Sequence, residues 1–205
     1  HIARAGRPGP VLVDLPKNVM AAQTEYDPGN VRIRNHEVLY KPAPKKMANL
    51  LSMLQEAKKP LIMTGGGVIL SRAAQELTDL ARKYRIPVTG TLMGLGSFPA
   101  SDPLWLGMLG MHGTYYANMA VSHCDLLLAV GVRFDDRVTG SIETFAPEAK
   151  IVHIDIDPSS INKNVTVDLP IVGDAQSALT DLLRFLEEHH YEPDIASRQA
   201  WLSEI

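Results

Sequence analysis

The stretch Leu61-Ile62-Met63-Thr64-Gly65-Gly66-Gly67 decides how this chain folds, because a short apolar run ends there in three glycines. A helical pattern begins a few residues later, near Ser71. This order predicts a strand that leads into a helix through a turn with almost no side chains. Glycine lets a backbone approach a ligand closely, and the amides at a helix N-terminus attract anions such as phosphate. Taken alone, the three glycines fit a tight turn and a phosphate cradle equally well.

Strands and helices alternate on both sides of this stretch. The predicted strands cover residues 61–63, 86–89, 126–130, 151–156 and 171–174, and the predicted helices cover about 45–57, 71–84, 114–120 and 175–186. Several of the strands are apolar throughout, which is typical of a parallel sheet covered on both faces. We therefore expect an α/β fold, namely a doubly wound, Rossmann-like parallel sheet of about six strands.

The spacing of apolar residues within the helical patterns indicates which side chains face the core. The expected inner faces are Met47, Leu50, Leu51 and Leu54, then Ala73, Leu77, Leu80 and Ala81, and finally Ala175, Ala178, Leu179, Leu182, Leu183 and Leu186. Thr114, Ser159 and Asp174 are expected to cap helices. Residues 97–113, rich in glycine and proline, are expected to form a loop.

Changes of pattern divide the chain into four parts. Residues 1–20 contain the apolar run Val11–Leu15, interpreted as a buried strand of a preceding domain. Residues 21–44 have little periodicity and several prolines, as a linker does. Residues 45–190 form the α/β domain, and 191–205 form a helical tail that leads towards another domain. Because the chain starts without methionine, in mid-motif, we expect it to be a piece of a longer protein.

Composition and charge exclude several classes of protein. The net charge of −3 does not indicate a nucleic-acid or anionic-membrane partner. No apolar run reaches the ~18 residues that span a bilayer. The single cysteine, Cys124, excludes an internal disulfide and is interpreted as a packed thiol rather than a nucleophile. It fits a reducing compartment, so we expect a cytoplasmic protein, or one of a plastid or mitochondrion if the source is a eukaryote.

The residues that follow the predicted strands share a chemistry. They are Gly65–Gly67, Thr91–Gly94, Gly131 with Arg133, Asp155–Ile156 and Gly173–Asp174. In an open α/β sheet a ligand binds beyond the carboxyl ends of the strands. Glycines admit a pyrophosphate, an arginine pairs with it, and an acid accepts hydrogen bonds from ribose hydroxyls. Together the strand tips favour a nucleotide site. In the alternative interpretation, the two acids only cap turns and Arg133 is a solvated charge.

The common catalytic motifs are missing from the sequence. There is no Gly-x-Gly-x-x-Gly fingerprint and no Walker A lysine, which disfavours an ordinary NAD dehydrogenase. There is no Gly-x-Ser-x-Gly, no His-Glu-x-x-His and no cysteine pair. His112 and His123 have no carboxylate at metal-ligand spacing, so we expect no metal site. His112 either faces a ligand or packs.

Four motifs resemble the catalytic subunit of acetohydroxyacid synthase, also called acetolactate synthase. In chain order they are Gly6–Lys17, Gly110–Gly113, Gly131–Gly140 and His153–Pro158. The first and third are long enough to be specific, and the match covers nearly the whole chain. The resemblance implies the end of an N-terminal thiamine-binding domain, a linker and a complete central domain.

An enzyme of this family condenses pyruvate with pyruvate or 2-ketobutyrate and releases CO2, the first common step of branched-chain amino-acid synthesis. The resemblance implies that the whole enzyme uses thiamine diphosphate and Mg2+, at sites outside this chain. It also implies that the central domain holds FAD, whose redox chemistry the net reaction does not use. A homo-oligomer, either dimer or tetramer, is implied, and a small regulatory subunit is a candidate partner.

The resemblance assigns roles residue by residue. The implied FAD contacts are Arg7, Gly65, Gly66, Gly67, Thr91, Leu92, Met93, Leu109, Gly110, Met111, His112, Gly131, Val132, Arg133, Asp135, Asp155, Ile156, Gly173 and Asp174. Arg137 is implied to bind the carboxylate of the second ketoacid, and Lys17, Met111 and Asp136 to line the substrate channel.

No catalytic residue is implied within this chain. The glutamate that activates thiamine is expected upstream of His1, and the Gly-Asp-Gly motif with its later asparagine downstream of Ile205. We therefore expect the chain alone to form no acetolactate.

Three interpretations of function stay open. The first is the FAD-carrying domain of acetolactate synthase. The second is the central domain of a sister enzyme, such as glyoxylate carboligase or a 2-ketoacid decarboxylase, which binds ADP or nothing. The third is a structural domain that only spaces two catalytic domains. The charged loop Arg133–Arg137 favours the first.

Overall fold

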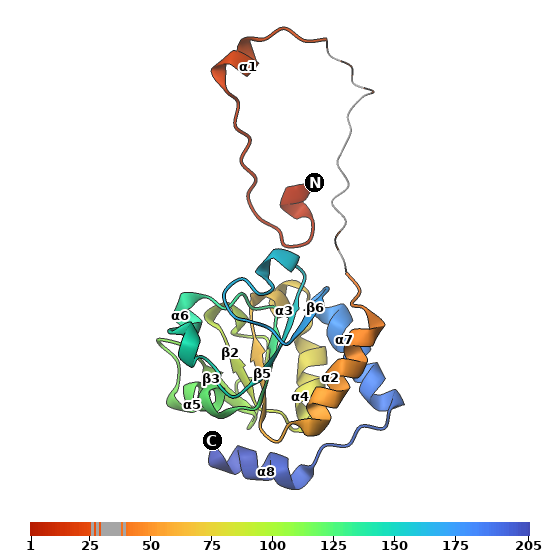
Figure 1. The fold of residues 1–205 in the computed structure, drawn as a ribbon, viewed down its shortest axis with the longest axis vertical. Coiled ribbons are helices and arrows are strands. Elements are labelled where there is room, and N and C mark those ends of the chain that lie inside the picture. Colours follow the sequence, from red (N-terminus) through yellow and green to blue (C-terminus); the bar gives the residue numbers. More distant parts are fainter. Residues whose placement is uncertain (26, 28, 30–37, 39) are drawn as a thin grey trace. The chain divides into compact units, whose positions relative to one another are not determined.

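The computed structural model describes residues 1–25, 27, 29, 38 and 40–205 (Figure 1). The chain divides into two compact units, His1–Val38 and Leu39–Ile205, and each is considered by itself. Much of the predicted linker, residues 26, 28, 30–37 and 39, lies outside the described residues. None of the described helices has both the length and the apolar character that crossing a membrane requires.

The second unit is built on a parallel six-stranded sheet. Its strands are β1 (Pro60–Thr64), β2 (Val88–Gly90), β3 (Trp105–Met108), β4 (Leu126–Val130), β5 (Lys150–Asp155) and β6 (Leu169–Val172). They lie in the order β3-β2-β1-β4-β5-β6, so the direction of winding reverses between β1 and β4. These two strands pair in register from Pro60 opposite Leu126 to Thr64 opposite Val130. The predicted doubly wound α/β fold is therefore confirmed.

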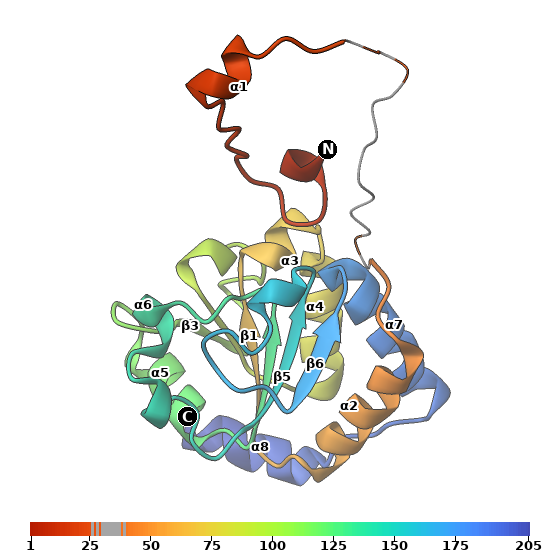
Figure 2. The same cartoon turned by 45° about the horizontal axis from the view of Figure 1, so that its top comes forward.

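Helices cover both faces of the sheet. Helices α2 (Pro44–Glu56), α4 (Ala74–Tyr84) and α7 (Ala175–Glu188) cover one face, where α2 and α7 lie side by side (Figure 2). Helices α5 (Tyr115–His123) and α8 (Ile195–Glu204) cover the other. Alternate residues of β4 pack on opposite faces of the sheet. Leu126 and Leu128 pack on the face with α2, α4 and α7, and Leu127 packs on the face with α5 and α8.

The predicted inner faces of the helices are nearly all correct. In α2 the four expected residues are the buried ones, and in α7 only Leu183 is half-buried rather than buried. Thr114 caps α5 by accepting a hydrogen bond from the Ala117 amide, and Asp174 caps α7 by accepting one from the Ser177 amide. The regular spacing in these helices reports burial well because one helix face meets one sheet face.

The predicted loop 97–113 is wrong in part, because it contains the edge strand β3. All residues of β3 are half-buried, and Gly107 has φ of 91°. A half-buried strand with a glycine shows neither alternation nor an unbroken apolar run, so nothing in the local pattern marks it.

The predicted start of the helix after β1 is also wrong. The short helix α3 (Gly66–Leu70) begins inside the glycine run, with Gly65 as its N-cap, and α4 follows after a turn at Arg72, which has φ of 61°.

The predicted cap Ser159 is also wrong. In the turn η5 (Pro158–Ser160), the Asp157 carboxylate is the cap, because it accepts a hydrogen bond from the Ser159 amide. An aspartate one residue ahead of proline suits a cap better than a serine within the turn.

In the first unit, the predicted buried strand Val11–Leu15 is absent from the described residues 1–25. These residues form no strand, and Leu12 is 88% exposed. The unit contains the turn η1 (Ile2–Arg4) and the short helix α1 (Lys17–Ala21). A strand needs a neighbouring strand to satisfy its backbone groups, and none is paired with this run here.

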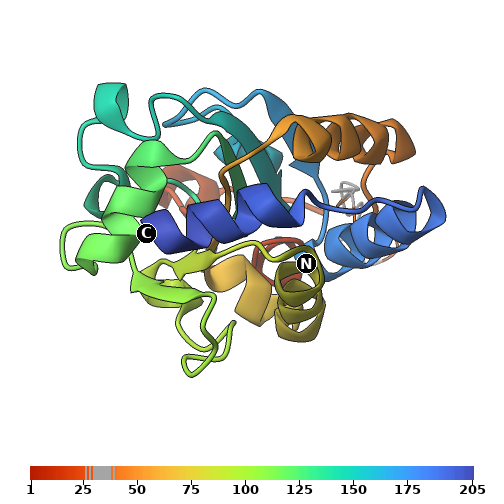
Figure 3. The same ribbon diagram turned by 90° about the horizontal axis from the view of Figure 1, so that it is seen from below.

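The helical tail is confirmed as α8, and it packs on the second unit. Trp201 is 1% exposed, and its indole Nε1 donates to the carbonyl of Pro60 at the start of β1. Arg198 is equally buried and donates to the Ala57 carbonyl at the end of α2. Figure 3, seen from below, shows α8 crossing this end of the unit. Its assignment as a linker towards another domain stays a prediction.

Cys124 is fully buried between α5 and β4, which confirms the packed thiol. Its Sγ donates to the Val121 carbonyl at 3.3 Å. Burial, followed by the nearby charge of Asp125, raises the pKa of the thiol to about 12. The thiol is therefore protonated at neutral pH, when a nucleophile would need the thiolate.

Candidate functional site

The ends of the strands form one continuous edge, which we call the carboxyl rim. Because all six strands run parallel, their carboxyl ends meet at the same side of the sheet. Backbone hydrogen bonds join neighbouring tips just beyond the strands, from Thr91 N to Thr64 O, Gly65 N to Val130 O, Gly131 N to Ile154 O and Gly173 N to Asp155 O. The structure therefore brings together the five predicted tips.

Three of the rim glycines pack against one another where the strand order reverses. A Cβ on Gly65 would overlap the Gly131 carbonyl oxygen, and one on Gly67 would lie 2.6 Å from the Gly131 Cα. Gly131 itself has φ of 60°, which favours glycine. Close backbone packing accounts for these three residues, as the tight-turn interpretation requires.

Gly66 has a different environment from its two neighbours. A Cβ there would lie 3.2 Å from the Cβ of Met93, a residue that is 74% exposed. Leu92, beside it in the turn η3 (Leu92–Gly94), is 67% exposed. Backbone packing thus does not explain Gly66, and apolar side chains stand open beside it.

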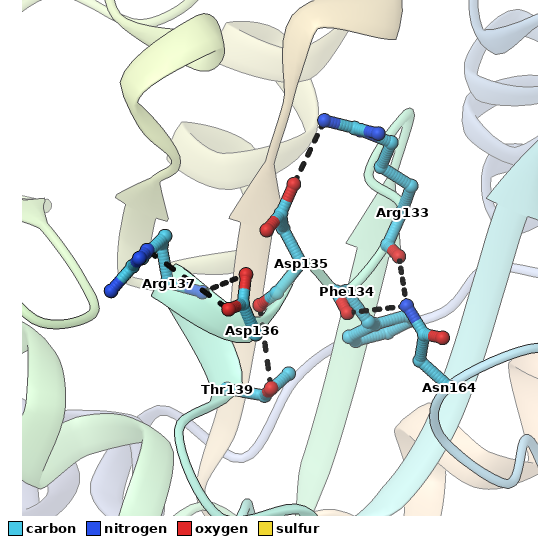
Figure 4. A network of polar contacts seen from close by, with 7 residues as sticks. All are labelled: Arg133, Phe134, Asp135, Asp136, Arg137, Thr139 and Asn164. Carbon is cyan, nitrogen blue, oxygen red and sulfur yellow. Dashed lines mark hydrogen bonds and ion pairs between the residues drawn. The ribbon is translucent and has the colours of Figure 1, made fainter.

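The loop after β4 carries a pair of opposite charges at the rim (Figure 4). Arg133 Nη2 donates to Asp135 Oδ2 at 2.8 Å, and both side chains reach solvent. Hydrogen bonding with the Asp136 carboxyl, and then the Arg133 charge, lower the pKa of Asp135. The loop therefore presents a guanidinium and an ionised carboxylate at neutral pH.

Three of the four predicted substrate-binding residues lie together, namely Met111, Asp136 and Arg137. The short helix α6 (Asp136–Thr139) places Arg137 Nη1 3.9 Å from the Met111 Sδ and Arg137 Nε 4.0 Å from Asp136 Oδ2. The Met111 amide also donates to the Arg137 carbonyl. The fourth, Lys17, belongs to the first unit together with Arg7, so the roles of both stay predictions.

The loop that carries Met111 and His112 is held by a residue that the sequence did not single out. Asn118 in α5 accepts from the Gly110 amide at 2.8 Å and donates to the Gly110 carbonyl at 3.1 Å. Gly110 has φ of 93°, and a Cβ there would lie 2.5 Å from the Arg137 carbonyl oxygen. These contacts fix the Met111 loop against α6.

The two acids predicted at the strand tips, Asp155 and Asp174, both hold turns. Asp155 Oδ1 accepts from the Asp157 amide at 2.8 Å, and Asp174 caps α7. Beside Asp174, Gly173 lies close to the segment 40–42, which covers this tip of the rim. These contacts match the alternative interpretation, and a nucleotide role for the two acids stays a prediction.

Two further residues escaped the sequence analysis. His153 and Asn164 hold backbone carbonyls of the loop after β4. His153 begins one of the four motifs and is polar within an otherwise apolar strand, but neither feature indicated its contact with this loop. An asparagine in a loop is ordinarily a turn residue, so Asn164 gave no signal at all.

Comparisons with known proteins agree with this architecture. The family model for the central domain of thiamine pyrophosphate enzymes matches residues 47–182. The chain is 49% identical to the probable acetolactate synthase large subunit of Methanocaldococcus jannaschii, over 100% of the chain and 35% of that protein. It is 46% identical to the acetolactate synthase large subunit of Cyanidium caldarium, over 100% of the chain and 36% of that protein. The identity to the Haemophilus influenzae large subunit is 43%, with the same coverage.

These findings confirm the resemblance noted in the sequence motifs. The chain spans about a third of the length of the curated relatives that it matches. The family match includes all six strands and the rim described above. The chain therefore belongs to the thiamine pyrophosphate enzyme family, of which it carries the central domain.

Proposed function

We propose that this chain is the central domain of an acetolactate synthase and that it holds FAD at the carboxyl rim. The observation that carries the proposal is the glycine turn Gly65–Gly67, which lies where the strand order reverses between β1 and β4. Ligands of open α/β sheets bind at this place. The similarity to acetolactate synthase large subunits supports the choice among thiamine enzymes.

The residues of the rim fit the chemistry of a flavin nucleotide. Gly66 leaves room for a pyrophosphate, and the Arg133 guanidinium, two residues beyond Gly131, supplies a positive charge for it. The exposed side chains of Leu92 and Met93 offer an apolar surface to a flat ring. When bound, FAD would supply an isoalloxazine ring whose redox chemistry the net reaction does not use.

The group around α6 fits the binding of a 2-ketoacid. Arg137 is 72% exposed at its side chain and offers a guanidinium to a carboxylate, with Met111 in contact as an apolar wall. In the whole enzyme we propose condensation of pyruvate with a second 2-ketoacid, at thiamine diphosphate and Mg2+ sites outside this chain. The chain alone is then inactive, and its proposed partners are further copies of the subunit and a regulatory subunit.

FAD should raise the melting temperature of the purified chain. A ligand at a hundredfold its Kd stabilises a folded protein by about 2.7 kcal/mol, which for this size corresponds to about 5–10 °C. Differential scanning fluorimetry with FAD, ADP and riboflavin measures the shift. An equal shift with ADP and FAD would favour the ADP-binding sister enzymes, and no shift with any of them would favour a structural domain.

The same titration on a Gly66→Val variant assigns the shift to the glycine turn. A branched side chain at Gly66 would fill the space beside Met93, so the FAD-dependent shift should vanish. Without FAD the variant should still fold, because relieving the 3.2 Å contact with the Met93 Cβ needs a shift of only a few tenths of an ångström in the exposed turn η3. A retained FAD shift would show that the turn is not the cradle.

A further inference from the structure

Three successive carbonyl oxygens in the loop after β4 are each held by a side chain from another part of the chain. The buried His153 in β5 bonds the Val132 carbonyl through Nε2 at 2.7 Å. Asn164 Nδ2 donates to the Arg133 carbonyl at 3.2 Å and to the Phe134 carbonyl at 2.9 Å (Figure 4). We call His153 and Asn164 together the loop clamp.

The clamped loop has a strained backbone. Phe134 has φ of 48°, which is uncommon for a residue with a bulky side chain. Such conformations persist only where the surroundings hold them. Here the Phe134 ring is buried against the edge of the His153 ring, with 4.9 Å between centroids, while Asn164 bonds the carbonyl of the same residue.

Within the part of the chain that the structure describes, the buried ring of His153 has one hydrogen-bonded and one unbonded nitrogen. Because Nε2 donates to a carbonyl, the proton of the neutral ring is on that atom, and burial lowers the pKa of His153. Its Nδ1 is then a buried acceptor without a partner among the described residues. An unpaired buried acceptor reduces stability, whereas an apolar residue would remove the donor to the Val132 carbonyl, so that bond to the loop is what the polar ring contributes.

The carbonyls that the loop clamp bonds lie within or next to the charged pair Arg133 and Asp135 in the sequence. Past Phe134, the Asp135 carbonyl accepts from the Val138 and Thr139 amides and starts α6. The loop is thus fixed on both sides of Arg133 and Asp135, whose side chains pair at the rim. The contacts of His153 and Asn164 are therefore among those that hold the turn at Phe134.

We propose that His153 and Asn164 are positioning residues that hold the Arg133 turn so that its guanidinium faces the pyrophosphate of FAD. The proposal rests on the FAD site proposed above. Neither side chain need touch the cofactor, since both act through backbone carbonyls. Their loss should weaken binding of FAD in protein that is fully folded.

The same substitution at two asparagines of one loop provides a matched test. In Asn164→Asp the amide donor that bonds two carbonyls is replaced by an acceptor. In Asn162→Asp the hydrogen bond of the side chain is kept. Asn162 uses its Oδ1 as acceptor for the Val167 amide, and an aspartate carboxylate can accept the same bond. Both variants add one negative charge within the same exposed loop, so the long-range effect of charge on an anionic ligand is similar.

The measurement is the Kd for FAD in the intact protein, at a temperature well below the melting temperature of each variant. Asn164→Asp should bind about tenfold more weakly than Asn162→Asp, as expected for the loss of two hydrogen bonds. Asn162→Asp should lie within about twofold of wild type. Equal affinities in the two variants would overturn the loop clamp. Failure of the wild type to bind FAD would overturn the FAD site and the clamp together.

A second pair of variants tests the other half of the clamp. His153→Gln keeps an N–H donor within reach of the Val132 carbonyl, whereas His153→Phe keeps only a ring. His153→Phe should bind FAD more weakly, and His153→Gln should recover part of the affinity. If the Phe variant binds as wild type does, His153 has no positioning role. If either variant fails to fold, the asparagine pair decides the question.

Discussion

Replacing Gly67 by alanine should lower the free energy of unfolding of the chain by about 3 kcal/mol, the upper end of the usual cost of overpacking. The added Cβ would lie 2.6 Å from the Gly131 Cα and 3.2 Å from the carbonyl carbon and oxygen of the same residue. Gly131 cannot withdraw easily, because its amide bonds Ile154 and its carbonyl accepts from the Gly67 amide. Two main chains would have to move, and the bonds between three strand tips would stretch.

Gly66→Ala is the matched control for this prediction. Its Cβ would lie 3.2 Å from the Met93 Cβ and 3.5 Å from the Met93 carbonyl oxygen, so the exposed turn η3 would have to shift by only a few tenths of an ångström. Alanine is also a better helix residue than glycine by up to about 1 kcal/mol, and Gly66 lies in α3. Urea unfolding followed by circular dichroism should therefore separate the two variants. A common midpoint would mean that the contact with Gly131 does not constrain the turn.

Trp201→Ala should cost about 4 kcal/mol, as expected when a fully buried aromatic side chain is removed. The indole is 1% exposed, lies among the apolar side chains of the α5 face, and bonds the Pro60 carbonyl at 3.1 Å. Its removal would leave both a cavity and an unpaired carbonyl at the start of β1. Denaturant unfolding of the purified variant measures the loss.

Two control variants separate the loss of the buried ring from the loss of its hydrogen bond and from a general effect of mutating α8. Trp201→Phe keeps a ring but loses the bond to Pro60, and should cost about 1 kcal/mol from that bond. Gln199→Ala, on the exposed side of α8, should change stability by less than about 0.5 kcal/mol. If Trp201→Ala resembled Gln199→Ala, α8 would be a tail that the domain does not need, as the assignment of residues 191–205 to a linker supposes.

The parts of the fold that could be predicted are those whose information is local. Helix α2 shows Met47, Leu50, Leu51 and Leu54 at helical spacing, and β4 is an unbroken apolar run that matches its predicted bounds. Strand β3 escaped because its half-buried residues acquire their role only by pairing with β2. Val11–Leu15 shows the opposite error, since an apolar run does not make a strand without a neighbour.

The location of the candidate site could be predicted from the sequence, but most contacts of its individual residues could not. A parallel sheet puts all strand tips on one edge, so the tips could be named without coordinates. The physical reason for each glycine could not be predicted in this way, because Gly67 and Gly131 come into contact only after β1 and β4 have paired. The same holds for Asn118 and Asn164, whose partners lie in other loops and leave no trace in local spacing.

The seam between β1 and β4 has a consequence for the order of assembly. Residues 60–108 supply one half of the sheet and residues 126–172 the other, and the seam joins the paired strands that are farthest apart in the sequence. Closing such a long loop is the slow and entropically costly part of building a sheet. The contact of Gly65 and Gly67 with Gly131 exists only when the seam is closed. A nucleotide bound across it, as proposed above, would recognise the finished sheet alone, and by mass action it would draw half-assembled chains towards completion.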